Sequence, residues 1–206
     1  MHQLSVKFKI LIDDTNVKMG AIGVVNFGGQ YNHLIKRRLE DLGFQAKLIN
    51  PNEPVQVLSR QLNCLIISGG SWNIPADIPR LGNAPKYVLE FPGPILGICL
   101  GHQLIAYEFG GVLGNKTPEF GGVRIRVDDE DTILKGVGVE FTAWESHNIS
   151  VDKEPSGFMV LAHSDSVKVQ AMANPRLGRY SVQFHPEVKH TEFGDIILRN
   201  FAELCS

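Results

Sequence analysis

The sequence predicts an α/β fold in which a mostly parallel sheet carries helices on both faces, with an antiparallel strand region in the second half. Short apolar runs alternate with helical patterns in the first half, and strand patterns follow one another in the second. The 206 residues, 43% of them hydrophobic, suffice for one sizeable core. No internal repeat or low-complexity linker divides them, so we expect a single domain.

In the first half, we expect strands at short apolar runs bounded by breakers and helices where apolar residues recur every three or four positions. The expected strands are 21–26, 45–49, 64–68 and 94–98, and the expected helices are 30–42, 55–62, 84–90 and 102–109. In the second half, the expected strands are 123–127, 140–143, 158–162, 167–172 and 180–184, several of them antiparallel, before a last helix at 192–204. Because sites in parallel sheets gather at the carboxyl ends of the strands, the functional site is expected there.

The first twenty residues do not fit this series. Residues 8–12 alternate weakly like an edge strand, and Met19 and Gly20 directly precede the first convincing strand. We therefore expect residues 1–20 to be an extension or leader, with Met19 as a candidate natural start, and the domain to span residues 21–206. No site residue is assigned to the extension.

Composition excludes several classes of protein. A formal net charge of −2 provides no broad basic surface, so neither nucleic acid nor an anionic membrane is an expected partner. No stretch approaches the roughly 20 apolar residues of a membrane span, and the start lacks the apolar core of a signal peptide. Three widely spaced cysteines form neither a disulfide framework nor a paired metal-ligand pattern, so we expect a cytoplasmic protein without a metal site.

The most informative segment runs from Gly97 to Gln103 (GICLGHQ), directly after an apolar run. It predicts that Cys99 stands at a sharp turn between a buried strand and a helix, where only small neighbours such as Gly97 and Gly101 fit. The thiolate is the nucleophilic form of cysteine, and a helix N-terminus together with a nearby imidazolium lowers the pKa of a thiol below about 8.5. Cys99 is therefore a candidate nucleophile.

A candidate base and its orienting group come much later in the chain. His185 ends a strand pattern, and Glu187 stands two positions further on, where it can orient the imidazole ring. The alternative for His185 is a core histidine that hydrogen-bonds a backbone carbonyl. Cys64 and Cys205, by contrast, are expected to be small buried apolar residues without a chemical role.

GICLGHQ at 97–103 with His-Pro-Glu at 185–187 resembles the class I, triad-type glutamine amidotransferases, and the similarity extends over nearly all of residues 21–205. Within that family, WESH at 144–147 and QFHPEVKHT at 183–191 look like the glutaminases of GMP synthetases, of the separate-subunit type found in many archaea. Anthranilate and aminodeoxychorismate synthase glutaminases share the first motif but usually have serine after His-Pro-Glu. The resemblance implies the class I glutamine amidotransferase fold and glutaminase activity.

The resemblance also implies a role for each matching residue. Cys99 would attack the side-chain amide carbonyl of glutamine, His185 would move the proton to the leaving ammonia, and Glu187 would hold the imidazole. The backbone N–H groups of Leu100 and Gly70 would form the oxyanion hole. The implied substrate contacts come from Gly69, Gln103, Ser146, His147 and Asn148.

Two positions depart from the family pattern. Ser71 stands where proline commonly follows the Gly-Gly pair, so we expect a less rigid loop. Asn148 and Ile149 stand in the region where the family commonly has an aspartate, so the contact to the amino group of the substrate stays unassigned.

A partner is implied as well. Conversion of XMP to GMP needs ATP, magnesium and a pyrophosphatase domain with a Ser-Gly-Gly-x-Asp-Ser phosphate loop, which residues 68–73 (SGGSWN) do not match. We therefore expect no cofactor in this chain, with ATP and Mg bound by a separate synthetase subunit that receives the ammonia. The glutaminase subunit of another synthase remains an alternative, and a non-catalytic binding module a more distant one. A papain-like protease is disfavoured because the cysteine lies in an α/β pattern.

Overall fold

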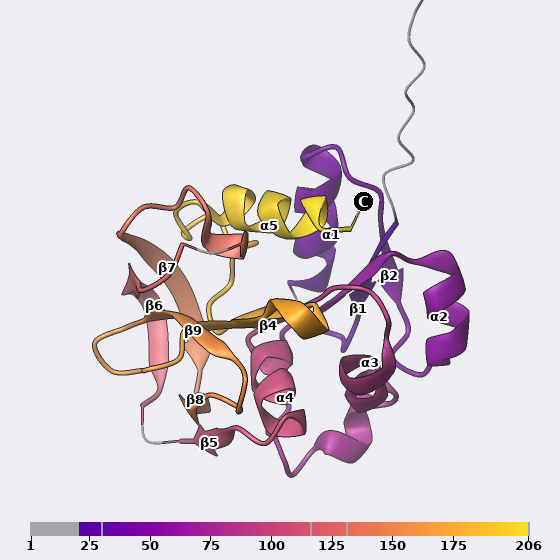
Figure 1. Cartoon of the computed structure of the whole chain (residues 1–206), viewed down its shortest axis with the longest axis horizontal. Helices are drawn as coiled ribbons and strands as arrows, with labels where there is room; N and C mark the ends of the chain where they lie inside the picture. The colour runs from indigo at the N-terminus through magenta and orange to yellow at the C-terminus, as the bar shows by residue number, and fades with distance from the viewer. Residues whose placement is uncertain (1–20, 30, 116, 131, 206) are drawn as a thin grey trace, which may run out of the picture.

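A large mixed sheet forms the centre of the computed structural model, which describes residues 21–29, 31–115, 117–130 and 132–205 (Figure 1). The expected extension at residues 1–20 lies outside the described residues. In the described part of the chain, this sheet has nine strands in the order β2-β1-β3-β4-β11-β10-β9-β6-β7. They are β1 (Ile22–Val25), β2 (Ala46–Ile49), β3 (Cys64–Ile67), β4 (Ile95–Ile98), β6 (Glu119–Val127), β7 (Glu140–His147), β9 (Met159–His163), β10 (Ala171–Asn174) and β11 (Arg179–Val182).

The sheet consists of a parallel half and an antiparallel half that meet at β11. Strands β2, β1, β3 and β4 pair in parallel, and β11 adds to β4 in the same sense. Beyond β11, the strands β10, β9, β6 and β7 pair antiparallel. A separate two-stranded sheet joins β5 (Val112–Gly114) to β8 (Ser150–Lys153). The predicted fold class is thus confirmed.

Helices cover both faces of the sheet, and each face has its own apolar core. Helices α1 (Asn32–Asp41) and α5 (Gly194–Glu203) pack on one face. Helices α2 (Val55–Gln61), α3 (Ala84–Glu90) and α4 (Leu100–Glu108) pack on the other. Val24 and its neighbour Val25 belong to different cores, because successive side chains of a strand point to opposite faces. No helix among the described residues is both long enough and apolar enough to span a membrane.

Element boundaries differ from the prediction mainly in the antiparallel half. Strands β6 and β7 pair continuously from Glu119 opposite His147 to Arg126 opposite Glu140, so both are longer than the expected 123–127 and 140–143. The cross-strand partner extends them through residues whose own pattern is weak. The strand expected at 167–172 lies instead at Ala171–Asn174, and β5 and β8 were not predicted. Smaller shifts place α1 at 32–41, α4 at 100–108, β11 at 179–182 and α5 at 194–203.

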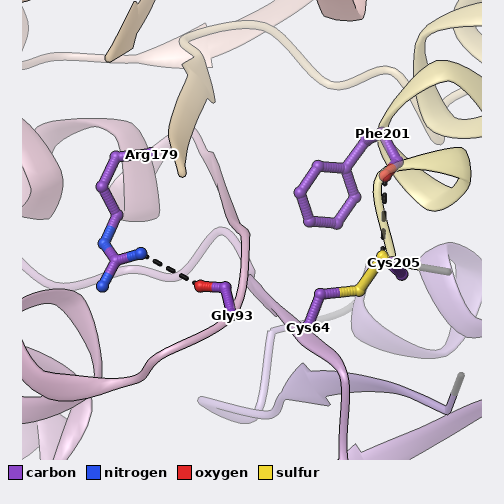
Figure 2. The surroundings of a disulfide bond; sticks show 5 residues. All are labelled: Cys64, Gly93, Arg179, Phe201 and Cys205. Atoms are coloured by element: carbon purple, nitrogen blue, oxygen red, sulfur yellow. Dashed lines mark hydrogen bonds between the residues drawn. A yellow bond between two sulfur atoms is a disulfide. The ribbon is translucent and has the colours of Figure 1, made fainter. Parts of the chain in front are cut away.

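A disulfide bond joins Cys64, at the start of β3, to Cys205, just after α5 (Figure 2). The prediction that these two cysteines form no disulfide is therefore wrong, although both are buried as expected. They stand 141 positions apart in the sequence, and only the packing of α5 on the sheet brings their Cα atoms to 5.6 Å. The bond ties the C-terminal helix to a central strand.

A second long-range tie is made by Arg179, the first residue of β11. Its buried guanidinium donates hydrogen bonds to the carbonyl oxygens of Val88 (2.8 Å), Phe91 (2.7 Å) and Gly93 (3.0 Å; Figure 2). Burial lowers the pKa of Arg179 to about 10, so the side chain remains a cation at neutral pH. It holds the segment between α3 and β4 against the start of β11.

Candidate active site

Cys99 stands at the sharp turn between β4 and α4, as the motif predicts. Its backbone has φ 52° and ψ −100°, and residues other than glycine rarely adopt such a positive φ. A Cβ atom at Gly97 would lie 2.5 Å from the backbone carbon of Gly101, and one at Gly101 would lie 2.1 Å from the carbonyl oxygen of Ile67. Only glycine fits at either position, so the turn that presents Cys99 requires both.

His185 and Glu187 follow β11, the parallel neighbour of β4, and therefore emerge at the same edge of the sheet as Cys99. The backbone N–H of Cys99 donates to the carbonyl of Val182 (2.9 Å), which joins the turn to the end of β11. His185 Nδ1 lies 2.8 Å from Glu187 Oε1, and its side chain is in hydrogen-bond contact with Cys99. The structure thus brings the three predicted catalytic side chains together in the order Cys99, His185, Glu187.

The surroundings of His185 favour the protonated ring. Burial acts to lower the pKa of His185, but the charge of Glu187 and the hydrogen bonds to Cys99 and Glu187 outweigh it and hold the pKa well above its usual range. The ring also packs against Tyr31, with 4.9 Å between centroids. An imidazolium fixed in this position can stabilise a thiolate at Cys99.

A cavity of about 550 Å³ opens beside these side chains and contains every substrate-contact residue predicted from the sequence. Cys99 and His185 reach it from the two central strands, while Gly69 and Gly70 follow β3. Its size suits a small metabolite. The predicted residues that line it are Gly69, Gly70, Cys99, Gln103, Ser146, His147, Asn148 and His185.

The Gly-Gly loop after β3 packs directly on the nucleophile turn. A Cβ atom at Gly69 would lie 3.0 Å from His185 Cε1 and 3.6 Å from Cys99 Cβ. One at Gly70 would lie 2.9 Å from Leu100 Cδ2. The two residues predicted to form the oxyanion hole, Gly70 and Leu100, are therefore neighbours. Leu100 is the first residue of α4, so its N–H lies among those that lack a partner within the helix.

The remaining predicted substrate contacts lie where β7 ends. The carbonyl of Ser146 accepts a weak hydrogen bond from Cys99 Sγ at 3.9 Å. Gln103 donates through Nε2 to the carbonyl of Ile149 (2.7 Å), so it also anchors the segment that follows β7. The side chain of His147 is buried near Glu119 and Glu145, and the residue also lines the cavity.

Several residues at or near the site were not assigned a role from the sequence. Tyr31, Trp72 and Phe120 line the cavity, and Phe120 is 63% exposed at its rim. Glu119 and Glu145 form with His147 a buried group whose potential ligand atoms lie within 4.8 Å of one another. The buried positions at the end of β7 are the polar residues Glu145 and His147, so neither their burial nor the pairing of β7 with β6 was detectable from the sequence.

Comparison with known proteins agrees with this geometry. The sequence model of the family described as glutamine amidotransferase class-I matches residues 23–205. The chain is 50% identical over 185 residues to a Saccharolobus solfataricus protein named as a glutamine-hydrolyzing GMP synthase subunit, covering 89% of this chain and 98% of that protein. A Methanocaldococcus jannaschii protein of the same name is 42% identical over 187 residues, with 89% and 97% covered. A crystal structure of a Thermoplasma acidophilum protein superposes with a TM-score of 0.84 at 38% identity, covering 90% of this chain and 93% of that one.

Proposed function

The chain belongs to the class I glutamine amidotransferase family, and we propose that it is the glutaminase subunit of a two-subunit GMP synthetase. It hydrolyses L-glutamine to glutamate and ammonia, which a separate ATP-dependent subunit uses to convert XMP to GMP. The observation that carries the proposal is the contact of His185 with both Cys99 and Glu187 beside a cavity that Cys99 and His185 line. Relatives named as glutamine-hydrolyzing GMP synthase subunits, matched over nearly their whole length, support the choice of synthetase.

In the proposed mechanism, the Cys99–His185 pair starts as thiolate and imidazolium, since Glu187 favours the protonated ring. Cys99 Sγ attacks the carbonyl carbon of the glutamine side-chain amide. His185 then gives its proton to the leaving nitrogen, so that ammonia departs and a thioester remains. A water molecule that loses a proton to the now neutral His185 hydrolyses the thioester. Glutamate leaves, and the ion pair is restored.

Both steps place a negative charge on the oxygen of the attacked carbonyl. We assign its stabilisation to the backbone N–H groups of Leu100 and Gly70, which need not reorganise during the reaction. The N-terminus of α4 adds the positive end of its dipole at Leu100. One such donor is worth about 3–4 kcal/mol, so a change in the Gly-Gly loop would control the rate strongly.

The ends of the substrate are assigned to the backbone where β7 stops. In this proposal, the backbone of residues 146–148 binds the amino and carboxylate groups of glutamine. Gln103 and Gly69 line the same cavity and contact the substrate there. Gln103 keeps this segment in place by binding the carbonyl of Ile149. The reacting amide then points toward Cys99, whose Sγ lies 3.9 Å from the carbonyl oxygen of Ser146.

The proposal assigns no cofactor or metal to glutamine hydrolysis by this chain, and it places ATP and Mg in the partner subunit. It also assigns the enzyme to the cytoplasm. A buried disulfide is unusual there, but the intracellular proteins of hyperthermophilic archaea are rich in such bonds. Docking of the partner is expected at the edge of the sheet where Cys99 lies, so that ammonia passes between the subunits.

The test is a steady-state glutaminase assay of the chain alone, with a candidate synthetase subunit, and with that subunit plus XMP and MgATP. We expect slow hydrolysis by the chain alone, acceleration in the full mixture, and formation of GMP. In a control assay, the chorismate-using subunit of anthranilate or aminodeoxychorismate synthase replaces the candidate synthetase subunit. Equal kcat in all mixtures, or coupling only to the chorismate-using subunit, would overturn the GMP synthetase assignment.

A further inference from the structure

A buried polar cluster lies on the inward face of β7, the strand whose end is proposed to bind glutamine. Along β7, the side chains of Glu145 and His147 point into the core while Ser146, between them, lines the cavity. The imidazole Nε2 of His147 lies 3.3 Å from Glu119 Oε2, on β6, and 3.4 Å from Glu145 Oε2. The proposed reaction uses none of these three side chains directly.

Glu119 is well supplied with hydrogen-bond donors. Its Oε1 accepts from the hydroxyl groups of Ser164 (2.6 Å) and Ser166, and its Oε2 accepts from Gln170 Nε2 (2.5 Å). Burial acts to raise the pKa of Glu119, but the hydrogen bonds from His147, Ser164 and Ser166 outweigh it and lower the pKa. Glu119 is therefore the ionised carboxylate of the cluster.

Glu145 has the opposite surroundings. It is 0% exposed, and neither of its carboxyl oxygens has a hydrogen-bond partner. His147 Nδ1 and Gln170 Oε1 are also buried without a partner. Buried polar groups are nearly always paired, and each of these atoms can accept a hydrogen bond. The cluster therefore has a surplus of acceptors, which a proton or a metal cation would remove.

A proton fits this surplus better than a metal ion. A histidine that binds a metal through one ring nitrogen almost always donates its other N–H to a neighbour, and His147 Nδ1 has no such neighbour. Gln170 Oε1 is a buried acceptor without a partner in the same cluster, and it can accept from a carboxylic O–H. One proton on Glu145 thus satisfies an oxygen of Glu145 and an acceptor beside it.

We propose that Glu145 is a positioning residue that, as a neutral carboxylic acid, supports residues 146–149 from beneath and so sets the affinity of the site for glutamine. This inference rests on the proposed function, because it assigns glutamine to the end of β7. The groups that face Glu145 are Glu119 from β6, His147 from β7, and Cys99 and His185 from the catalytic turn and the end of β11. On α4, His102 in turn faces His147.

The charges around Glu145 explain why it stays neutral. Burial, the ionised Glu119 and the Cys99 thiolate raise the pKa of Glu145 well above its usual range, and the opposing effects of His185 and Gln170 are smaller. A second negative charge at Glu145 would repel Glu119 across the pair of strands that carries the substrate contacts. Neutral Glu145 lets β6 and β7 stay paired up to His147.

The first test measures the free energy of unfolding of the whole chain between pH 4 and pH 8, without glutamine. A raised folded-state pKa contributes stability that is complete below the unfolded pKa of about 4.3 and is lost as pH rises toward the folded pKa. Glu145→Gln cannot ionise in either state. As pH rises from the unfolded pKa to the folded pKa of Glu145, the equilibrium constant for unfolding of the Glu145→Gln variant should therefore fall relative to that of the wild type. The expected fall is up to about tenfold per pH unit.

The matched control is Glu140→Gln, at the exposed end of the same strand, where folding leaves the side chain in contact with solvent. A Glu145→Gln effect that stays constant with pH would mean that Glu145 is ionised in the folded protein, and would overturn the proposal. So would a stoichiometric divalent cation, found by elemental analysis of the wild type and lost from Glu145→Gln. Neither result would bear on whether the chain is a glutaminase.

The second test separates binding from chemistry in the glutaminase reaction. Glu145→Ala should raise KM for glutamine about tenfold with a smaller change in kcat, since it removes the support beneath Ser146. Glu145→Gln should recover most of that loss because it is a neutral mimic of similar shape. If Glu145→Gln and Glu145→Ala are equally impaired, or if only kcat falls, the positioning role is wrong. Absence of hydrolysis in the wild type would instead count against the proposed function.

Discussion

The parallel and antiparallel halves of the sheet build one cavity by different means. In the parallel half, backbone geometry places the nucleophile, because Cys99 adopts φ 52° between two glycines that no larger residue can replace. In the antiparallel half, we propose that buried side chains support the cavity wall, namely Glu119 on β6 and Glu145 and His147 on the inward face of β7. Backbone placement requires particular residues at fixed spacing and so leaves a motif. Support by cross-strand side chains joins segments far apart in the sequence, so a local motif, WESH at 144–147, contains only Glu145 and His147 and not their partner Glu119.

The two halves meet where the catalytic groups lie. Cys99 follows β4, the last strand of the parallel series, and His185 follows β11, which is parallel to β4 but antiparallel to β10. The register sets Ile98 opposite Val182, so the two strands end side by side. Perturbing each half separately therefore separates chemistry from support.

The largest expected effect is on the parallel side, at the nucleophile itself. Cys99→Ala should lower glutamine hydrolysis by roughly 10⁴-fold or more, since no other nucleophile is assigned. Alanine is smaller than cysteine and meets the same positive φ, so the fold and binding of the partner should persist. Steady-state ammonia release and thermal unfolding measure the two effects. Substantial hydrolysis by a folded Cys99→Ala protein would refute the covalent mechanism.

The next effect probes the group on the other side of the junction. His185→Ala should slow hydrolysis by roughly 10²- to 10⁴-fold, the usual worth of a positioned acid–base group. Glu187→Gln should slow it less but should move the alkaline limb of the kcat/KM profile to lower pH, because the charge of Glu187 raises the pKa of His185. An unchanged alkaline limb would show that Glu187 does not control the protonation of His185.

A third prediction concerns stability at a distance from the cavity. Loss of the Cys64–Cys205 disulfide in Cys64→Ser should lower the free energy of unfolding by about 3–5 kcal/mol, because the bond closes a long loop in the unfolded chain. Hydrolysis at 25 °C should be little changed. Chemical denaturation with and without reductant measures the effect in the wild type. If reductant leaves the wild-type midpoint in place, the bond does not contribute to stability.

The smallest effect is expected from metal removal. Neither the thiol mechanism nor a neutral Glu145 needs a cation, so exhaustive chelation should leave the glutaminase rate of the isolated chain within error. GMP formation with the partner should still require magnesium. Restoration by added zinc of a rate lost on chelation would contradict both the mechanism and the neutral cluster.

The difference between the halves also explains which elements the sequence predicts well. Helix 84–90 and the strand of Cys64 were placed almost residue for residue, because buried parallel strands and amphipathic helices have strong local patterns. In the antiparallel half, β10 was misplaced and β5 and β8 were missed. Short strands of that kind depend on their partners, and propensity is a weak guide to them.

By itself, the sequence determined the fold class, the family and the candidate triad. Glycines at fixed spacing around Cys99 and a His-Pro-Glu at a strand end are local requirements of the chemistry, and so they are visible in one chain. Only the tertiary structure decided the Cys64–Cys205 disulfide, the full length of β6 and β7, and the meeting of Glu119, Glu145 and His147. Those features arise from contacts between segments far apart in the sequence, and no local pattern encodes which segments will pack together.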